Sequence, residues 1–367
     1  KYNCHYPYRG GKAFSHLKSN TTFIPDFQLG ERPITVTDDA SLNRLFTVHF
    51  YVVDEPDSFI PGLTHISHSF YLVEGVKGVY GCFELFKYAK PYRVKLECLI
   101  LNVDRNPTLM VNTPYYMYSH RLPLTIETLL PIGHILTDII QSKLLQQGYT
   151  LLHCSAITLN DRAIIFLAPP DTGKTLMSIL GVLHLGFKLI SEDMAVVDED
   201  GSIYSVPNTT TFIRNRWLMR RLRDRGFLTT EDYYKALITS WFEGKPPLLL
   251  PLKPIPPRIH HKIPFKDKAR IEAIVLLSKR QGDVVEEIDF DKVFNLAILY
   301  NKLEFTYYKN PFIQIYSLIN PSYSTSRLTI LESQVINRAL SKAKRILHVK
   351  MSRPSTDLLR QIVREVL

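Results

Sequence analysis

The chain has 367 residues, enough for two domains of ordinary size. Hydrophobic residues make up 45% of it, which suffices for a globular core. No apolar run approaches the roughly 20 residues of a membrane helix, and no apolar stretch follows the basic N-terminus, so we expect neither a membrane span nor a signal peptide. The four cysteines are scattered without a CxxC pair, which argues against structural zinc and predicts a reduced, cytoplasmic compartment.

The formal net charge of +10 is concentrated in one part of the chain. Residues 214–280 hold 16 Lys and Arg against 6 Asp and Glu, which equals the whole excess. Such a local excess favours an anionic partner, although a solvated surface explains it equally well. We expect a basic, partly helical insertion at about 214–260 and a proline-rich connector at 246–257. The candidate contacts to an anion or nucleic acid are Arg214, Arg216, Arg220, Arg221, Arg223 and Arg225.

The first part of the chain has the character of β-structure. Residues 1–25 are polar with Gly10-Gly11, and we expect a tail or irregular arm there. Beyond it, β-branched and aromatic runs alternate with turn residues. They predict a smaller, mainly β (α+β) N-terminal domain over residues 1–130, with strands at Thr47–Val53, Ser69–Val73, Val79–Phe86 and Arg93–Val103.

Residues 131–367 alternate between helical and strand patterns, which predicts an α/β domain. One apolar stripe predicts a helix at 132–147, and Gly148 is placed as its left-handed cap. A turn at Asn160-Asp161 predicts a hairpin or two adjacent strands. The further expected strands are 151–158, 163–167, 188–190, 195–197, 271–277 and an edge strand at 346–349; the helices are 174–185, 289–301, 331–344 and a last one capped by Ser355 or Thr356.

The segment Ala168–Thr175 has the spacing and the strand–loop–helix context of a phosphate-binding loop. Backbone N–H groups at a helix N-terminus and the helix dipole favour an anion. The Lys174 ammonium would neutralise the β- and γ-phosphates, and the Thr175 hydroxyl would ligate Mg²⁺. Gly173 allows close approach of the backbone to a phosphate. The predicted nucleotide-binding residues are Asp171, Thr172, Gly173, Lys174 and Thr175.

This loop departs from the standard pattern in three ways. Ala168 stands where glycine is usual, Pro169 and Pro170 remove two N–H donors, and Asp171 adds a negative charge. Asp171 tolerates a left-handed conformation better than most residues. The alternative interpretation of the segment is a strand-to-helix turn with an exposed lysine.

Two further features lie near the loop in sequence. Glu192 and Asp193 follow a predicted strand, where one carboxylate could hold Mg²⁺ and the other accept a proton from an acceptor hydroxyl. A solvated turn is the simpler explanation of such a pair. His153 lies in an apolar strand, where a histidine is more often a hydrogen-bonded core residue than a catalytic one.

Taken together, four stretches resemble the catalytic domain of HPr kinase/phosphorylase, a group akin to phosphoenolpyruvate carboxykinase. They are Leu152–Ile157, Ile165–Thr175, Leu185–Asp193 and Val206-Pro207. The resemblance is good over 150–207, loose over 270–367 and absent over 1–130. It implies a P-loop kinase domain of that type.

Several residue roles follow from this resemblance alone. It implies that Gly173, Lys174 and Thr175 bind the triphosphate and Mg²⁺ and that Asp193 is the base. It also gives His153 a catalytic role, and it implies a metal role for Glu192, which replaces an Asp.

Three functions follow as expectations. The first is an ATP- and Mg²⁺-dependent kinase acting on a hydroxyl of a protein, peptide or small molecule. The second is an RNA kinase that binds RNA through residues 214–280. The third is a non-catalytic nucleotide-binding module with a degenerate loop. Relatives include hexamers, so a homo-oligomer is also open.

Overall fold

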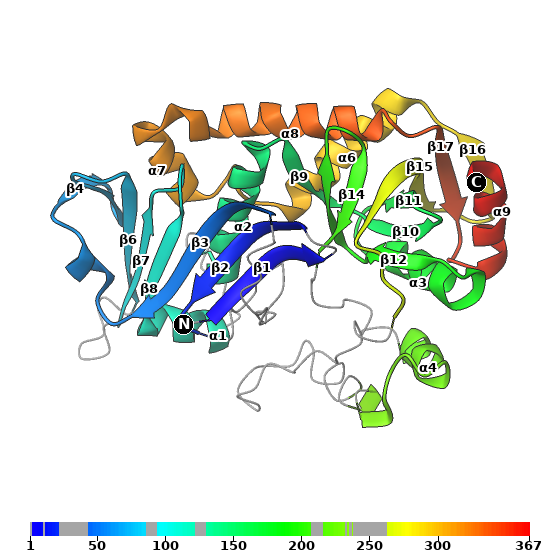
Figure 1. Cartoon of the computed structure of the whole chain (residues 1–367), viewed down its shortest axis with the longest axis horizontal. Coiled ribbons are helices and arrows are strands. Elements are labelled where there is room, and N and C mark those ends of the chain that lie inside the picture. The colour runs from blue at the N-terminus through cyan, green and yellow to red at the C-terminus, as the bar shows by residue number, and fades with distance from the viewer. Residues whose placement is uncertain are drawn as a thin grey trace. The chain divides into compact units, whose positions relative to one another are not determined.

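The computed structural model describes residues 2–9, 12–21, 43–85, 94–121, 130–206, 216–231, 233–234, 237 and 263–367 (Figure 1). The chain forms two compact units, each described by itself. Unit 1 comprises Lys1–Gln147, Pro247–Lys253 and Phe305–Leu331, and unit 2 comprises Gly148–Pro246, Pro254–Glu304 and Glu332–Leu367. Among the described residues, no helix combines the length and apolar character needed to cross a bilayer.

Unit 1 is built on a mixed sheet with the strand order β1-β2-β3-β8-β7-β6-β5-β4. β3 pairs in parallel with β2 and β8, and the other pairs are antiparallel. The strands are β1 (Tyr2–Arg9), β2 (Lys12–Ser19), β3 (Asn43–Val53), β4 (Leu63–Ser67), β5 (Phe70–Val73), β6 (Gly78–Leu85), β7 (Val94–Leu101) and β8 (Thr108–Asn112). The helices are η1 (Pro56–Phe59), α1 (Thr113–Arg121), α2 (Ile132–Leu145), α7 (Pro311–Ile319) and η5 (Pro321–Tyr323).

The four strands predicted in this region are confirmed, but the expectation of a tail at residues 1–25 is wrong. β1 and β2 form an antiparallel pair, and β2 then pairs in parallel with β3. The aromatic residues of β1 favour strands. The decisive partner, β3, lies far along the chain, so local composition does not reveal the pairing.

Unit 1 does not end at residue 130, because α2 and residues 305–331 belong to it. Buried Asp138 on α2 accepts hydrogen bonds from Asn310 Nδ2 at 2.9 Å and Thr306 Oγ1 at 3.1 Å. Gln146 Nε2 donates to the Ser322 carbonyl at 2.9 Å. These polar contacts join a predicted second-domain helix to the first unit, so the unit is discontinuous in sequence.

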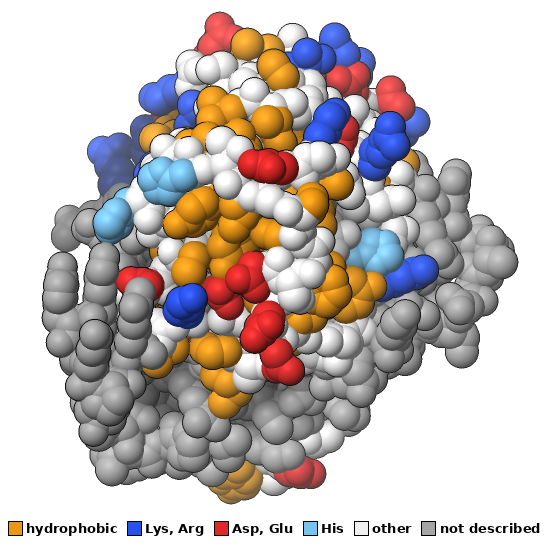
Figure 2. Space-filling view, turned by 90° about the vertical axis from the view of Figure 1, so that its left-hand side faces the viewer, with side chains coloured by type: hydrophobic (Ala, Val, Ile, Leu, Met, Phe, Trp, Pro, Cys, Tyr) orange, Lys and Arg blue, Asp and Glu red, His pale blue; other side chains and the backbone are white. Residues whose placement is uncertain are grey.

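Among the described residues, no strand pairs with the outer side of β4 in the unit 1 sheet. β4 is the edge strand, and all five of its residues are exposed. Figure 2, which views the left-hand side of Figure 1, shows hydrophobic side chains gathered in the middle of this face with acidic and basic ones around them. The exposed hydrophobic residues on and around η1, β4 and the β5–β6 turn include Phe59, Leu63, Ile66 and Val76. Unit 1 therefore has a strand edge at which a further strand could pair.

Unit 2 is a mixed sheet covered by helices on both faces, as expected for an α/β domain. Its strand order is β12-β10-β11-β15-β14-β13-β9, and β17 joins β15 and β16. The strands are β9 (Tyr149–His153), β10 (Ser155–Leu159), β11 (Arg162–Leu167), β12 (Lys188–Ser191), β13 (Met194–Asp198), β14 (Ser202–Ser205), β15 (Lys268–Lys279), β16 (Val284–Glu287) and β17 (Arg345–Met351). The helices are α3 (Lys174–Leu185), α4 (Arg216–Asp224), α6 (Phe290–Glu304), α8 (Thr325–Leu340, which crosses the division between units) and α9 (Thr356–Val366).

The alternation of side chains along β11 creates two cores. Ile164 and Phe166 pack with residues of α3 and α9, whereas Ile165 and Leu167 pack with residues of α6 and α8. β11, β15 and β17 are parallel to one another. β17 pairs with β15 on one side and with β16 on the other, so it is an interior strand and its assignment as an edge strand is wrong. Two predicted features are confirmed, since α3 spans Lys174–Leu185 and the Ser355 hydroxyl accepts a hydrogen bond from the Leu358 N–H at 3.2 Å as the cap of α9.

Candidate active site

The candidate phosphate loop lies between the end of β11 and the start of α3. Asp171 has φ +58° and Gly173 has φ +111°, so the loop uses left-handed backbone at the residues predicted to tolerate it. Gly173 is the N-cap of α3, and Lys174 and Thr175 lie in the first turn of that helix. A β-carbon at Gly173 would lie 2.5 Å from Pro354 Cγ. Both conformation and packing therefore require glycine there.

Lys174 is buried inside the unit, contrary to the alternative of an exposed lysine. The residue is only 5% exposed. Its ammonium donates to the Ala168 carbonyl at 2.8 Å and lies 2.9 Å from His153 Nε2. Burial lowers the pKa of Lys174, while the negative charge of Asp193 acts in the opposite direction. The buried Lys174 side chain at the N-terminus of α3 thus points toward His153 at the end of β9.

Strand pairing brings His153 and Asp193 together. His153, the last residue of β9, pairs with Met194 at the start of β13. Asp193 directly precedes Met194 and therefore lies close to His153. The Thr175 hydroxyl donates to the Glu192 carbonyl at 3.3 Å, which holds the β12–β13 turn against the first turn of α3. The side chain of Glu192 is buried. The sheet thus unites the loop, the acidic pair and the histidine.

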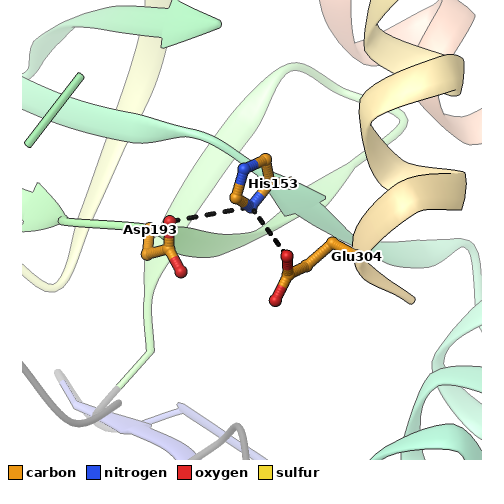
Figure 3. Close-up of side chains that lie close together, drawn as sticks. All are labelled: His153, Asp193 and Glu304. Carbon is orange, nitrogen blue, oxygen red and sulfur yellow. Dashed lines mark ion pairs between the residues drawn. The ribbon is translucent and has the colours of Figure 1, made fainter. Parts of the chain in front are cut away.

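Sequence reasoning missed Glu304, which comes from the end of α6. His153 Nδ1 lies 3.7 Å from Asp193 Oδ1 and 3.9 Å from Glu304 Oε2 (Figure 3). The side chain of His153 is 5% exposed, whereas those of Asp193 and Glu304 are 28% and 30% exposed. Solvent or a substrate can therefore reach the two carboxylates but scarcely the imidazole.

A buried amide explains why Glu304 reaches the site. Asn301 is fully buried; its Oδ1 accepts from the His153 N–H at 2.8 Å, and its Nδ2 donates to the Leu151 carbonyl at 2.8 Å. Asn301 thereby fixes the last turn of α6 against β9. Residues three apart share one face of a helix, so Glu304 lies beside Asn301 and faces His153. A signal in the sequence could have indicated this contact, since Asn301 and Glu304 are polar residues three positions apart at the end of a largely apolar helix.

The ionisation of the site follows from burial and close charges. Burial, and next the Lys174 ammonium, lower the pKa of His153 to about 4, although Asp193 acts to raise it. Burial and the charge of Asp193 raise the pKa of Glu304, and Lys174 opposes them. At neutral pH the imidazole is therefore neutral, beside a cation on one side and two carboxyl groups on the other.

The residues of this site also have the character of a cation site. His153 Nδ1 is buried and has no hydrogen-bond partner among the described residues. One ligand atom each from His153, Asp193 and Glu304 lies within 4.8 Å of the others. Distances of 3.7 and 3.9 Å are too long for hydrogen bonds but leave room for an ion between the groups. With Nδ1 as a ligand the set would suit Mn²⁺ or Zn²⁺ better than Mg²⁺, which prefers oxygen ligands, but Nε2 would then carry the ring proton and could not accept a hydrogen bond from Lys174.

The predicted basic residues form a separate feature of unit 2. Four of them, Arg216, Arg220, Arg221 and Arg223, lie on α4, and Arg225 follows its end. Arg214 and the proline-rich connector lie outside the described residues.

Comparison of the sequence with protein-family models finds no match, and comparison with curated proteins finds none either.

Proposed function

We propose that this chain is a phosphotransferase that binds a nucleoside triphosphate, ATP with Mg²⁺ in the first instance, and transfers its γ-phosphoryl group to a hydroxyl. One observation carries the proposal. Lys174, buried under a left-handed loop at the N-terminus of α3, contacts His153, and His153 faces the partly exposed Asp193 and Glu304. The helix end that we propose binds phosphate therefore lies beside the carboxylates that we propose for proton transfer. The fold this proposal implies is that of the HPr kinase and phosphoenolpyruvate carboxykinase group.

In this mechanism the backbone of Asp171, Thr172 and Gly173 surrounds the phosphates, and Lys174 neutralises their charge. Asp193 accepts the proton of the acceptor hydroxyl while the acceptor oxygen bonds to the γ-phosphorus. The bond from that phosphorus to the β–γ bridging oxygen breaks, and the nucleoside diphosphate leaves with the electron pair. His153 lies 3.7 Å from Asp193, beyond hydrogen-bond distance, so we give the neutral imidazole an electrostatic role beside Asp193 and no contact with the acceptor.

A divalent cation would be held by Thr175 or by the carboxylates of Asp193 and Glu304, because an imidazole that accepts the Lys174 hydrogen bond at Nε2 carries its proton on Nδ1. When bound, it supplies positive charge that stabilises the phosphoryl oxygens. The buried side chain of Glu192 makes a direct contact with a solvated ion less favourable than a contact through the exposed carboxylates.

Nucleotide binding and turnover test the proposal. Calorimetry with ATP and Mg²⁺ compares the natural chain with Lys174→Met, and Lys188→Met on an exposed position of β12 is the control for lost charge. We expect Lys174→Met to weaken binding at least tenfold and Lys188→Met to leave it unchanged. If the natural chain binds neither ATP, GTP nor pyrophosphate, the proposal fails.

Asp193→Asn separates catalysis from binding. A general base contributes about 10²–10⁴-fold, so at a saturating concentration of the divalent cation we expect this variant to bind ATP but to lose turnover by that factor. Turnover is measured as release or transfer of radiolabelled phosphate, with Asp200→Asn, an exposed position, as control. Equal rates in the natural chain and in Asp193→Asn would instead favour a non-catalytic nucleotide-binding module.

A further inference from the structure

The helix α4 is anchored by one face and presents the other to solvent. Leu218, Met219 and Leu222 are buried in the hydrophobic cluster that also contains residues of α3 and α9. Arg216, Arg220, Arg221 and Arg225 are exposed, and Trp217 is 49% exposed. Apolar packing thus holds four guanidinium groups and an indole in place on one surface, which we call the α4 face (Arg216, Trp217, Arg220, Arg221 and Arg225).

Neighbouring elements add positive charge to the α4 face. The charges of Arg225, Arg221 and Arg360 on α9 all lower the pKa of His184 near the end of α3, after the larger effect of burial. The acidic residue of α4, Asp224, pairs with Arg223 at 3.0 Å and not with the α4 face. Cations gathered in this way repel one another unless an anion lies against them.

The residue types favour a nucleic-acid backbone with unstacked bases. All the cations of the α4 face are arginines, whose planar fork binds phosphate through two parallel hydrogen bonds. The Arg221 guanidinium lies 5.5 Å from the centre of the Trp217 ring, and Tyr234 nearby in sequence is 55% exposed. Aromatic rings among phosphate-binding cations form the stacking surfaces of single-strand binding proteins.

We propose that the α4 face binds single-stranded nucleic acid, with the four arginines on its phosphates and Trp217 stacked on a base. A lipid surface fits less well, because a helix that inserts into a bilayer needs a free apolar face and that of α4 is buried. The inference does not depend on phosphoryl transfer at Lys174 and Asp193.

Fluorescence anisotropy with a labelled RNA of about 20 nucleotides tests the proposal across a salt series. Four phosphate contacts predict a log–log salt slope of about −3, from about 0.7 per contact on single strands. We expect the fourfold variant Arg216→Gln, Arg220→Gln, Arg221→Gln, Arg225→Gln to lose at least tenfold in affinity at low salt and to flatten the slope. Trp217→Ala should weaken binding about fivefold or more with the slope unchanged.

A matched variant controls for total charge. Arg105→Gln, Arg280→Gln, Arg327→Gln and Arg338→Gln remove four exposed arginines elsewhere, and we expect this protein to bind RNA like the natural chain. Calorimetry with ATP should not distinguish the two fourfold variants, and circular dichroism shows that both are folded. The proposal is overturned if the two variants lose RNA affinity equally or if the natural chain does not bind at about 50 mM salt. It is also overturned if phosphatidylserine vesicles bind and RNA does not.

Discussion

The Lys174 ammonium lies 2.9 Å from His153 Nε2, a buried contact between two groups that are both cationic in their protonated forms. Because the pKa of His153 is lowered to about 4, the imidazole is neutral at pH 7 and its Nε2 can accept a hydrogen bond from the ammonium. Nδ1 then faces Asp193 and Glu304. This contact joins the first residue of α3 to the cluster of His153, Asp193 and Glu304.

Removing the ammonium should raise the pKa of His153. Lys174→Met keeps the bulk of the side chain and deletes its charge, so we expect the pKa to rise from about 4 toward 6.5 but to stay below it, because burial remains. NMR titration of the imidazole, with a chelator present, measures the change. Lys188→Met should leave the value where it was. An unchanged pKa in Lys174→Met would mean that the contact is not made in solution.

Loss of the Glu304 or Asp193 carboxylate should weaken the binding of a divalent cation. We expect Mn²⁺ to bind the natural chain and Glu304→Gln or Asp193→Asn to weaken it at least tenfold, since each removes a charged ligand. Electron paramagnetic resonance of free Mn²⁺ gives the affinity without nucleotide. Glu365→Gln on the exposed side of α9 is the control. Equal affinities in all four proteins would exclude this cluster as the cation site.

Gly173 should be far less tolerant of a side chain than Gly186, the cap at the other end of α3. Both have positive φ, but a β-carbon at Gly186 meets nothing within 4 Å, whereas one at Gly173 meets Pro354 Cγ at 2.5 Å. We expect Gly186→Ala to cost about 1–2 kcal/mol in free energy of unfolding and Gly173→Ala about 1–3 kcal/mol more. Urea unfolding measures both.

Pro354→Ala supplies the corresponding double-mutant test. In that background the additional cost of Gly173→Ala should shrink, because the atom it meets is gone. An undiminished cost would assign the whole effect to backbone strain.

Asp138 should make unit 1 less stable as the pH rises. Burial raises its pKa to about 7 from an ordinary 3.8, against the hydrogen bonds from Asn310 and Thr306. The folded state therefore binds the Asp138 proton more tightly than the unfolded state does. The resulting contribution to the free energy of unfolding is present in full below pH 3.8 and is lost as the pH rises to about 7. Each pKa unit corresponds to about 1.4 kcal/mol.

Asp138→Asn removes this titration. We expect the stability of the natural chain relative to Asp138→Asn, measured by urea unfolding, to decline between about pH 4 and 7. Asp54→Asn at an exposed position of unit 1 serves as the reference for the loss of a carboxylate. A difference independent of pH would show that Asp138 does not titrate in this range.

Local sequence patterns determined the elements whose ends carry their own turn chemistry. The predicted bounds of α3 are confirmed, and the structure gives a local reason for them: Gly173 and Gly186, at its two ends, take left-handed conformations that glycine adopts freely. The hairpin at Asn160-Asp161 followed in the same way, since both residues have positive φ. These signals depend on neighbours in sequence, so no tertiary structure is needed to find them.

Only the tertiary structure decided which elements meet. It placed β17 inside the sheet and paired β2 with β3. It also brought Glu304 to His153 through the buried amide of Asn301, which lies 148 positions from His153 in the sequence. Strand order and helix packing depend on contacts between residues far apart in the chain, and no local pattern encodes their partners. The sequence by itself determined the loop and its lysine, whereas the cluster that the lysine faces exists only because the sheet folds β9, the β12–β13 turn and α6 together.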